Sequence, residues 1–431
     1  MILFSIVILF VCLFIGTPVP VSFMAVALYG LIVGDHDPSF LIPYGASKLG
    51  AVILFSIPLF IIAGGIIERG SIGSKIVDSV QKPFARIKGG LGVILVVSCA
   101  VFGSITGSAC ATLSCIGSIM FPKMEKAGFS KAHTATLLAN AAPLGMLIPP
   151  SGIVILYSWL SGQSVLAGFL STVVPGIILT ILFALINVYL VKDDPNVTIE
   201  LPSSNPILLK EKKRCSSALP ALFLPVIILG GIYGGVITTV EAASVSVVYA
   251  IVVGYFYYKE LTWNAIKESL VDGATVTGVV MIMVFGINML SRIYIMEDLP
   301  TKILDILKMV SENKYMILLM LNIFMVVMGM LMDDTSACML CTPILVPIIK
   351  EIGVSPIQFA AILSVNLGMG NVTPPCAPLL YLAGSLGGAQ INKMIKPCMY
   401  YIFLGWIPVL ILTTYIPDIS LFLPRLILGI K

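Results

Sequence analysis

The sequence predicts an all-α polytopic membrane protein that consists of two inverted repeats with re-entrant helical hairpins and broken helices. Three observations lead to this prediction. Hydrophobic residues make up 58% of the 431 residues and charged residues 11%, whereas soluble domains carry about 25% charged residues. Apolar runs long enough to cross a hydrocarbon layer recur along the chain. The motifs of the first half return in the second half at a constant shift of 225 residues.

The composition also limits the function. Too few polar residues are present to cover a water-soluble globule, which excludes a soluble enzyme and a disordered regulator. A net charge of +4 offers no basic face to nucleic acid. The nine cysteines are single, apart from Cys338 and Cys341 in an apolar stretch. Without a second pair or a histidine partner they predict packing residues rather than a zinc site.

Eight apolar runs are candidates for simple spans, because about 20 helical residues cross ~30 Å of hydrocarbon. The first run, MILFSIVILFVCLFIG, has no basic region and no small-residue cleavage site. We therefore expect a retained span there rather than a signal peptide. The eight runs lie near residues 2–16, 20–34, 51–67, 164–191, 220–238, 243–258, 275–292 and 399–416.

Four longer apolar blocks are interrupted near their middles by Gly, Ser, Thr, Asp or Pro. Lipid cannot satisfy free backbone groups, so irregular backbone at this depth is tolerated only where protein or a water-filled cavity surrounds it. The interruptions therefore mark candidate sites. We predict re-entrant hairpins over 91–122 and 315–349 and broken helices over 130–160 and 356–386.

A polar segment, 192–217, divides the chain almost in half. A shift of 225 residues superposes Pro149-Pro150 on Pro374-Pro375 and aligns the spans of both halves without a gap, which indicates an internal repeat. We predict a first repeat over 1–191, a cytoplasmic linker over 192–217, a second repeat over 218–416 and a C-terminal tail over 417–431.

The distribution of Lys and Arg predicts the orientation, because basic residues favour cytoplasmic loops. Seventeen of the 25 basic residues fall in five segments that we place in the cytoplasm. Both termini then lie on the opposite side, and the two hairpins open to opposite sides, so the halves are inverted. Inverted repeats with discontinuous helices are typical of secondary transporters; a passive channel or a structural scaffold is the alternative class. The five segments are 68–90, 123–131, 192–217, 259–274 and 387–398.

The first hairpin turns within the string GSITGS, which contains Ser104, Thr106, Gly107 and Ser108. Small residues let the chain reverse, and the hydroxyls and freed carbonyls are hard oxygen ligands suited to a cation such as Na⁺. The helix that follows points its positive end at the same depth, which favours an anionic substrate group. A small-residue face for helix packing is the structural alternative.

The first broken helix is interrupted at PLGMLIPPS, residues 143–151. Pro149 and Pro150 lack N–H groups and suit the first turn of a new half-helix. The carbonyls before them, around Gly145 and Ile148, lose their helical donors and become candidate cation ligands. The alternative is a proline kink whose free groups are satisfied by neighbouring helices.

The second half repeats both interruptions in altered form. Its hairpin turns at MDDTS, where Asp333 or Asp334 could bind a cation, pair with a backbone donor, lock the tip, or be solvated at the outer interface. Its broken helix reads GMGNVTPP, in which Thr373 is a hydroxyl beside the break. We also expect Asn366 and Asn371 to contact substrate.

Two ionisable residues near span ends have structural explanations. Glu241 is expected to cap the helix that follows it, and His133 is expected to be solvated beside a Lys-rich turn. With two histidines, no metal-ligand spacing and no Ser-His-Asp set, the sequence predicts no catalytic site, so the protein is not expected to be an enzyme.

The ordered motifs GSITGSACATLSCIGSIMFPKMEKAGFS, LGMLIPPS, TTVEAASVSVVYA, MLMDDTSACMLCTPILVPIIKEIGVSP and GMGNVTPP resemble the large membrane subunit of TRAP (tripartite ATP-independent periplasmic) transporters, of the DctM/SiaM type. The resemblance covers essentially the whole chain. It implies an elevator-type, sodium-coupled importer of an organic anion in a bacterial inner membrane. It also implies two partners, a small four-helix membrane subunit as a separate chain and a periplasmic substrate-binding protein.

The resemblance also implies site residues, with two or more Na⁺ as the coupling ions. The substrate stays open among sialic acid, C4-dicarboxylates and related sugar acids, and a stand-alone sodium/organic-anion symporter is the alternative. The sequence departs from the family pattern at Gly353-Val354-Ser355-Pro356 and Pro374-Pro375-Cys376-Ala377. The implied first sodium site is Ser104, Thr106, Gly107, Ser108, Gly145 and Ile148; the second is Asp333, Gly368, Gly370 and Thr373; the candidate substrate contacts are Ser151, Asn366 and Asn371.

Overall fold

The computed structural model describes residues 2–70, 72–84, 87–197 and 219–430, and over these ranges it contains helices and turns but no β-strand. Among the described residues, six helices are long and apolar enough to cross a membrane, or seven if the bent pair Lys131–Leu147 and Gly152–Ser161 counts as one span. The predicted all-α membrane fold is confirmed. The six are Val52–Arg69, Val165–Val191, Thr239–Tyr257, Trp263–Met296, Lys314–Leu331 and Ile391–Tyr415.

The first half contains eleven described α-helices. They are α1 Ile2–Phe14, α2 Val19–Val33, α3 Leu41–Leu49, α4 Ser56–Arg69, α5 Ile72–Phe84, α6 Gly90–Thr106, α7 Ala109–Lys126, α8 Lys131–Ala141, α9 Leu144–Leu147, α10 Gly152–Ser161 and α11 Val165–Val191.

The second half contains eleven more described α-helices and two π-helical turns. They are α13 Leu219–Tyr233, α14 Thr239–Val252, η3 Val253–Tyr257, α15 Trp263–Met296, α16 Leu299–Val310, α17 Lys314–Leu331, α18 Asp334–Glu351, α19 Pro356–Gly370, α20 Pro378–Gly387, α21 Ile391–Tyr401, η4 Ile402–Trp406, α22 Ile407–Tyr415 and α23 Pro417–Leu428.

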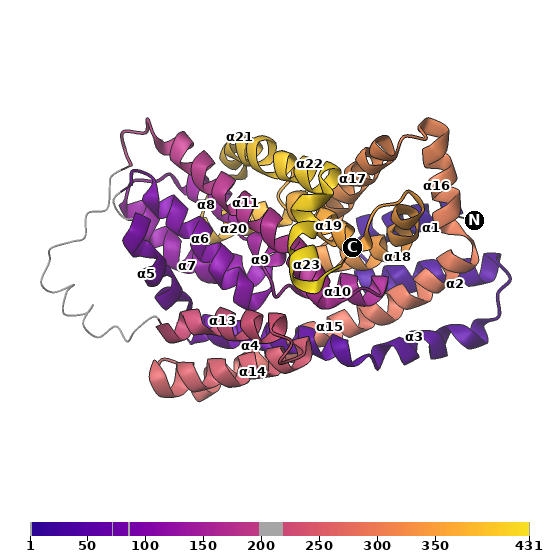
Figure 1. Cartoon of the computed structure of the whole chain (residues 1–431), viewed down its shortest axis with the longest axis horizontal. Helices are drawn as coiled ribbons and strands as arrows, with labels where there is room; N and C mark the ends of the chain where they lie inside the picture. The colour runs from indigo at the N-terminus through magenta and orange to yellow at the C-terminus, as the bar shows by residue number, and fades with distance from the viewer. Residues whose placement is uncertain (1, 71, 85–86, 198–218, 431) are drawn as a thin grey trace, which may run out of the picture.

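The helices of the two halves correspond at the spacing seen in the sequence. The hairpin α6–α7 and the hairpin α17–α18 begin and end 225 residues apart to within one residue, and so do the half-helices α10 and α20. Figure 1 shows the first hairpin at the left, beside α5, and the second at the right, beside α16. The repeat is therefore present in the helix boundaries as well as in the motifs.

Each hairpin turns because its sequence stops one helix and caps the next. Gly107 ends α6 in the left-handed conformation, with φ +61°, where glycine is favoured. Ser108 is the N-cap of α7, and its hydroxyl accepts a hydrogen bond from the Ala111 N–H. In the second hairpin Asp333 is the N-cap of α18 and accepts from the N–H groups of Thr335 and Ser336.

Several segments that lie between or after the predicted spans form short helices. The helix α5 lies within 68–90, and α16 lies between the predicted span 275–292 and the predicted hairpin 315–349, at an equivalent place in the second repeat. Each helix is too short and too polar on one face to resemble a span in sequence. The predicted tail over 417–431 contains α23, whose Leu421 packs beside Ala167 and Ile357. Most of the predicted linker 192–217 lies outside the described residues.

Candidate functional site

The tip of the first hairpin packs directly against the break in the first broken helix. A Cβ on Gly103 would lie 2.2 Å from the Gly145 Cα, and a Cβ on Gly107 would lie 2.8 Å from the Pro150 carbonyl oxygen. Backbone therefore contacts backbone, and only glycine allows this approach. The structure brings the predicted tip and break residues of the first half together.

The hydroxyl groups at this tip are buried, and their oxygen atoms can still accept a hydrogen bond or coordinate a cation. Ser104 and Thr106 are 4% and 2% exposed. The Ser104 hydroxyl donates to the Val101 carbonyl at 2.7 Å, and the Thr106 and Thr112 hydroxyl oxygens are 3.3 Å apart. Thr112, which sequence reasoning missed, itself donates to the Ser108 carbonyl at 2.8 Å. Each hydroxyl thus has its one proton engaged and lone pairs left over.

The break leaves oxygen atoms without their usual donors. Pro149 and Pro150 have no N–H, so the carbonyls of Gly145 and Met146 cannot accept the i+4 helical hydrogen bond. Ser151 is fully buried, and its hydroxyl has no hydrogen-bond partner among the residues that the structure describes. Buried polar atoms are nearly always paired, so an unpaired one beside a helix break points to a ligand or an ordered water.

Ile148 contributes backbone to the same break. It is half-buried, and its backbone leaves the helical conformation, with φ −90° and ψ 115°. Its own N–H is taken by the Leu144 carbonyl at 2.8 Å. Ile148 can therefore offer a coordinating atom only through its carbonyl oxygen.

The second hairpin meets the second broken helix in an equivalent way. A Cβ on Gly370 would lie 2.7 Å from the Gly329 Cα. The Thr373 hydroxyl donates to the Met369 carbonyl at 2.6 Å, and the Thr373 N–H donates to the Gly370 carbonyl at 3.1 Å. Gly370 and Thr373 thus lie together. Gly368 packs against the Trp406 ring, and a Cβ on this glycine would lie 2.7 Å from the ring.

The second tip differs from the first because its cap is an acid. Asp333 is exposed, and its carboxylate accepts hydrogen bonds from the N–H groups of Thr335 and Ser336 and from the Ser336 hydroxyl. Asp334 accepts a further bond from the Thr335 N–H at 3.1 Å. The Asp333 carboxylate is thus committed to capping α18, which is one of the uses that the sequence left open.

The two predicted asparagines have different surroundings. Asn366 is fully buried; its amide N–H group donates to the Asn322 side-chain carbonyl at 3.0 Å, and Asn322 donates to the Thr414 hydroxyl at 3.0 Å. Within the described part of the chain, the Asn366 side-chain oxygen has no hydrogen-bond partner. Asn371 is 4% exposed and ends α19. The Asn322 and Thr414 contacts join three helices and could not be read from the sequence.

The hairpins and broken helices of the two halves interlock. The half-helix α10 packs along α18, and α20 packs along α7. The Cys338 thiol of α18 lies 3.7 Å from the Ile153 carbonyl of α10, and a Cβ on Gly117 of α7 would meet Leu386 of α20 at 2.5 Å.

The cysteines only partly fit the predicted packing role. Cys110 and Cys376 are exposed, one just after the first tip and the other just after the second Pro-Pro break. Sequence reasoning missed this, because a small apolar residue and an accessible thiol look alike in the sequence. The described cysteines that are buried are Cys99, Cys115, Cys338, Cys341 and Cys398.

The two ionisable residues with predicted structural roles differ in outcome. Glu241 forms a capping box with Thr238, which confirms its role as a cap. His133 is not solvated as predicted: its Nε2 lies 3.0 Å from the Asn187 side-chain oxygen, and the Asn187 amide donates to the Gly89 carbonyl at 2.9 Å. The partners come from α8, α11 and the start of α6, which are far apart in the sequence.

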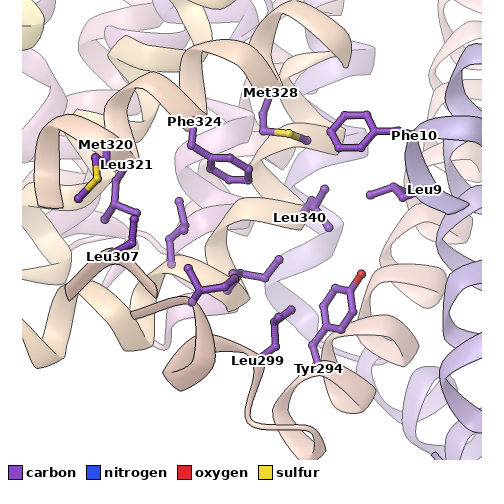
Figure 2. Close-up of a pocket in the computed structure, with 13 residues that line it drawn as sticks. Leu9, Phe10, Tyr294, Leu299, Leu307, Met320, Leu321, Phe324, Met328 and Leu340 are labelled. Carbon is purple, nitrogen blue, oxygen red and sulfur yellow. The ribbon is translucent and has the colours of Figure 1, made fainter. Parts of the chain in front are cut away.

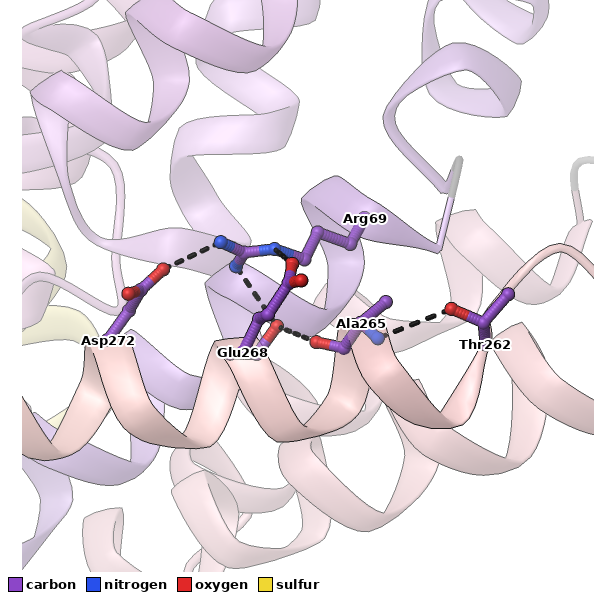
Figure 3. Close-up of polar contacts among 6 residues, drawn as sticks. Arg69, Thr262, Ala265, Glu268 and Asp272 are labelled. Carbon is purple, nitrogen blue, oxygen red and sulfur yellow. Dashed lines mark hydrogen bonds and ion pairs between the residues drawn. The ribbon is translucent and has the colours of Figure 1, made fainter.

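A charged cluster joins α4 to α15. The Arg69 guanidinium lies 2.6 Å from Asp272 and 3.6 Å from Glu268 and donates to the Ser269 hydroxyl at 3.1 Å. Figure 3 shows Arg69 spanning the face of α15. These side chains are partly exposed, so each ion pair contributes about 1 kcal/mol or less. Their main effect is to fix the orientation of the two helices.

Comparison with known proteins identifies the family. Residues 6–419 match the family described as "Tripartite ATP-independent periplasmic transporter, DctM component". The chain belongs to this family. It is a multi-pass membrane protein and the large permease component of a TRAP transporter, and its relatives are permeases rather than enzymes.

The chain is also similar to two named relatives and to one solved structure. It is 30% identical over 373 residues to the C4-dicarboxylate TRAP transporter large permease protein DctM of Pseudomonas aeruginosa, covering 86% of each chain. It is 30% identical over 411 residues to the isethionate TRAP transporter permease protein DctMQ of Oleidesulfovibrio alaskensis, covering 95% of this chain and 64% of that protein. The Alcanivorax borkumensis YdaH transporter, whose structure is described as having an unusual topology, is similar with a TM-score of 0.62, 13% identity and coverage of 87% and 86%. That likeness concerns the fold alone.

Proposed function

We propose that this permease imports an organic anion by sodium-coupled, binding-protein-dependent symport with an elevator movement. The observation that carries the proposal is the paired contact of hairpin tip and helix break, Gly103 on Gly145 and Gly329 on Gly370. Each contact places hydroxyls and carbonyl oxygens at a break in the backbone, where hard cations are bound.

We assign a first sodium ion to the first tip and break. Its candidate ligands are the hydroxyls of Ser104 and Thr106, backbone oxygens of Gly107 and Ser108, and the carbonyls of Gly145 and Ile148. Two observations support this assignment. Among the described residues, the buried hydroxyl oxygens of Ser104 and Thr106 have lone pairs that accept no hydrogen bond from the backbone, and the Gly145 carbonyl oxygen lacks its helical N–H donor because residue 149 is a proline. Substrate would lie next to this ion, within reach of the unpaired hydroxyl of Ser151.

We assign a second sodium ion to the second tip and break, near the carbonyls of Gly368 and Gly370 and the hydroxyl of Thr373. Asp333 would act beside it through its charge and by capping α18, since its oxygens already accept several hydrogen bonds. Asn366 and Asn371 stay candidate substrate contacts. The unpaired side-chain oxygen of the buried Asn366 supports the first of these.

The elevator movement is supported by a division of the helices into two packed groups. The hairpins and broken helices interlock through the α10–α18 and α7–α20 contacts. The helices α2, α3, α4, α14 and α15 pack on one another, and Figure 1 shows α3, α4, α14 and α15 along the lower edge of the view. We assign the first group to a transport domain and the second to a scaffold, with α5 and α16 as the connections.

An organic anion is the proposed cargo. The half-helix α10 begins just after its N-cap Ser151, beside the first tip, and its N-terminal dipole favours a negative group there. The named substrates of the two relatives, a C4-dicarboxylate and isethionate, are both anions. Sialic acid and related sugar acids meet the same requirement. The tripartite family description supports a small four-helix membrane subunit and a periplasmic binding protein as partners.

The distribution of the basic residues supports an orientation with both termini on the periplasmic side of a bacterial inner membrane. It can be tested in a chain from which the exposed cysteines have been removed. A membrane-impermeant thiol reagent added to intact cells should label Glu312→Cys, before the second hairpin, and leave Glu125→Cys, after the first hairpin, unlabelled. Equal labelling of both would contradict the inverted arrangement.

The central test of the proposal is uptake into proteoliposomes that contain this permease and its small subunit. We expect uptake of the cognate anion to require an inward Na⁺ gradient and the binding protein, because the binding sites accept a small cation and the family works as a three-part system. Replacement of Na⁺ by K⁺ should abolish uptake. Full uptake without the binding protein would instead favour a stand-alone symporter, and fast uncoupled flux would favour a channel.

Thr106→Val and Thr373→Val should weaken the sodium dependence of uptake. Each substitution removes a hydroxyl with little change in volume, and the loss of one ligand worth about 1.4 kcal/mol raises the half-saturating Na⁺ concentration about tenfold. Thr275→Val on α15 is the matched control, since its exposed hydroxyl likewise bonds to a helical carbonyl. An unchanged sodium response in both test variants would remove these hydroxyls from the ligand set.

A further inference from the structure

An apolar cavity of about 170 Å³ lies between α1, the end of α15, α16 and the second hairpin. Figure 2 shows side chains such as Leu307 of α16, Met328 of α17 and Leu340 of α18 surrounding one space. Tyr294 is the one polar side chain among the residues that line it. A buried water needs two to four polar partners, so this lining favours an apolar occupant.

The cavity opens toward the lipid-facing side of the helices. Phe324 lines it and is 38% exposed, whereas Met328, one turn further along α17, is 1% exposed. Outside the cavity, the same helices carry the exposed apolar side chains Ile323 of α17 and Ile306 of α16. In a membrane protein such residues contact acyl chains. The cavity is therefore within reach of the hydrocarbon layer.

The helix α16 gives the cavity a polar edge. Ile303 and Leu307 are one turn apart and line the cavity, while Lys302 and Lys308 are exposed. An amphipathic helix of this kind lies at the boundary between acyl chains and head groups. Neither lysine has an ion pair among the described residues. Both ammonium groups are thus available to an anionic head group.

We propose that this cavity binds one acyl chain of a membrane phospholipid, with the head-group phosphate beside Lys302 or Lys308. The volume is sufficient for a segment of chain, because an apolar cavity of about 150 Å³ lined by Leu, Ile and Phe binds a benzene ring. An empty cavity would leave its lining without dispersion contacts on one side. Lipid is the apolar molecule that the bilayer supplies at high concentration.

The cavity lies between helices that would move relative to one another during transport, so a bound acyl chain would be displaced by that movement. Its walls come from α1 and α15 on one side and from α16 and the second hairpin on the other. If the hairpin moves relative to the scaffold, the chain has to slide or leave in each cycle. This consequence rests on the proposed elevator movement, whereas the binding of the acyl chain does not.

The binding can be tested by photo-crosslinking in vesicles of phosphatidylethanolamine and phosphatidylglycerol. A trace of phospholipid with a diazirine near the middle of one acyl chain is activated, and the labelled residues are located by peptide mass spectrometry. We expect labelling to concentrate on Phe10, Leu307 and Phe324 above the level at the exposed control residue Ile323. Equal labelling of lining and control residues would overturn the proposal.

A filled cavity provides the second arm of the test. Leu307→Trp should reduce the labelling of the lining residues to the level of the exposed control, because the indole occupies the space. The adjacent Ile306→Trp is the matched control, since Ile306 is 61% exposed and does not line the cavity; it should leave the labelling unchanged. Labelling that persists in a folded Leu307→Trp variant, or capture of a photoactivatable free fatty acid but not of the phospholipid, would overturn the assignment. Crosslinking does not depend on uptake, so this result is separate from the test of transport.

Discussion

Gly103→Ala is expected to abolish sodium-driven uptake and to destabilise the protein. Its Cβ would lie 2.2 Å from the Gly145 Cα, whereas ordinary contacts lie at 3.4–4 Å. The obstructing atom belongs to the backbone, so no side chain can move aside. Overpacking in a closely packed interior costs typically about 1–3 kcal/mol. This outweighs the gain of about 1 kcal/mol from replacing glycine by alanine in a helix.

Uptake should respond more strongly than stability, because the clash separates the first tip from the break that supplies the other half of the proposed sodium site. The measurements are the midpoint of thermal denaturation in detergent and the initial rate of uptake. Gly278→Ala on α15 is the matched control: nothing lies within 4 Å of its Cβ position, so we expect unchanged uptake and equal or slightly higher stability. A Gly103→Ala variant with normal sodium-dependent uptake would show that the contact is not required.

The hairpins and broken helices could be predicted because their signals are local. Gly107 can adopt a positive φ, Ser108 and Asp333 can cap a helix, and a Pro-Pro pair removes two N–H groups at one place. In the lipid environment such interruptions stand out against long apolar runs. Each signal also occurs twice, once in each repeat, so the turn positions predicted in one half could be checked against the other half. These predicted turns coincide with the observed helix ends.

The contacts between distant segments could not be predicted in this way. Nothing local indicates that Asn187 accepts His133 as a partner or that Arg69 meets α15. The amphipathic helices α5, α16 and α23 were also missed, because a 12- or 13-residue helix with a polar face reads as a loop when the search is for spans. For the candidate site, the sequence indicated the tips and breaks, but Thr112 and Asn322 emerged only from the packing of the helices.

Trp406→Ala is expected to cause the second large effect. Trp406 is fully buried, its indole N–H donates to the Asn140 side-chain carbonyl at 3.1 Å, and its ring packs against Gly368. It therefore contacts both broken helices. Removing a buried tryptophan side chain costs about 3–5 kcal/mol, and we expect a lower denaturation midpoint together with loss of uptake. Trp263→Ala, at a site 73% exposed on α15, is the control and should change stability little.

The two functions of the Trp406 ring can be separated by a double-mutant cycle with Gly368. Trp406→Phe leaves the buried Asn140 oxygen without its donor, which costs about 1–3 kcal/mol. Gly368→Ala alone should destabilise the protein, because its Cβ would lie 2.7 Å from the outer edge of the indole ring. The smaller phenylalanine ring removes that edge, so the double variant should be less destabilised than the sum of the single variants. Strict additivity would mean that Trp406 and Gly368 do not share this contact. If the double variant is less destabilised than the sum of the single variants and also regains uptake, the spacing of the two broken helices sets the geometry of the transport site. The indole hydrogen bond would then not be what sets it.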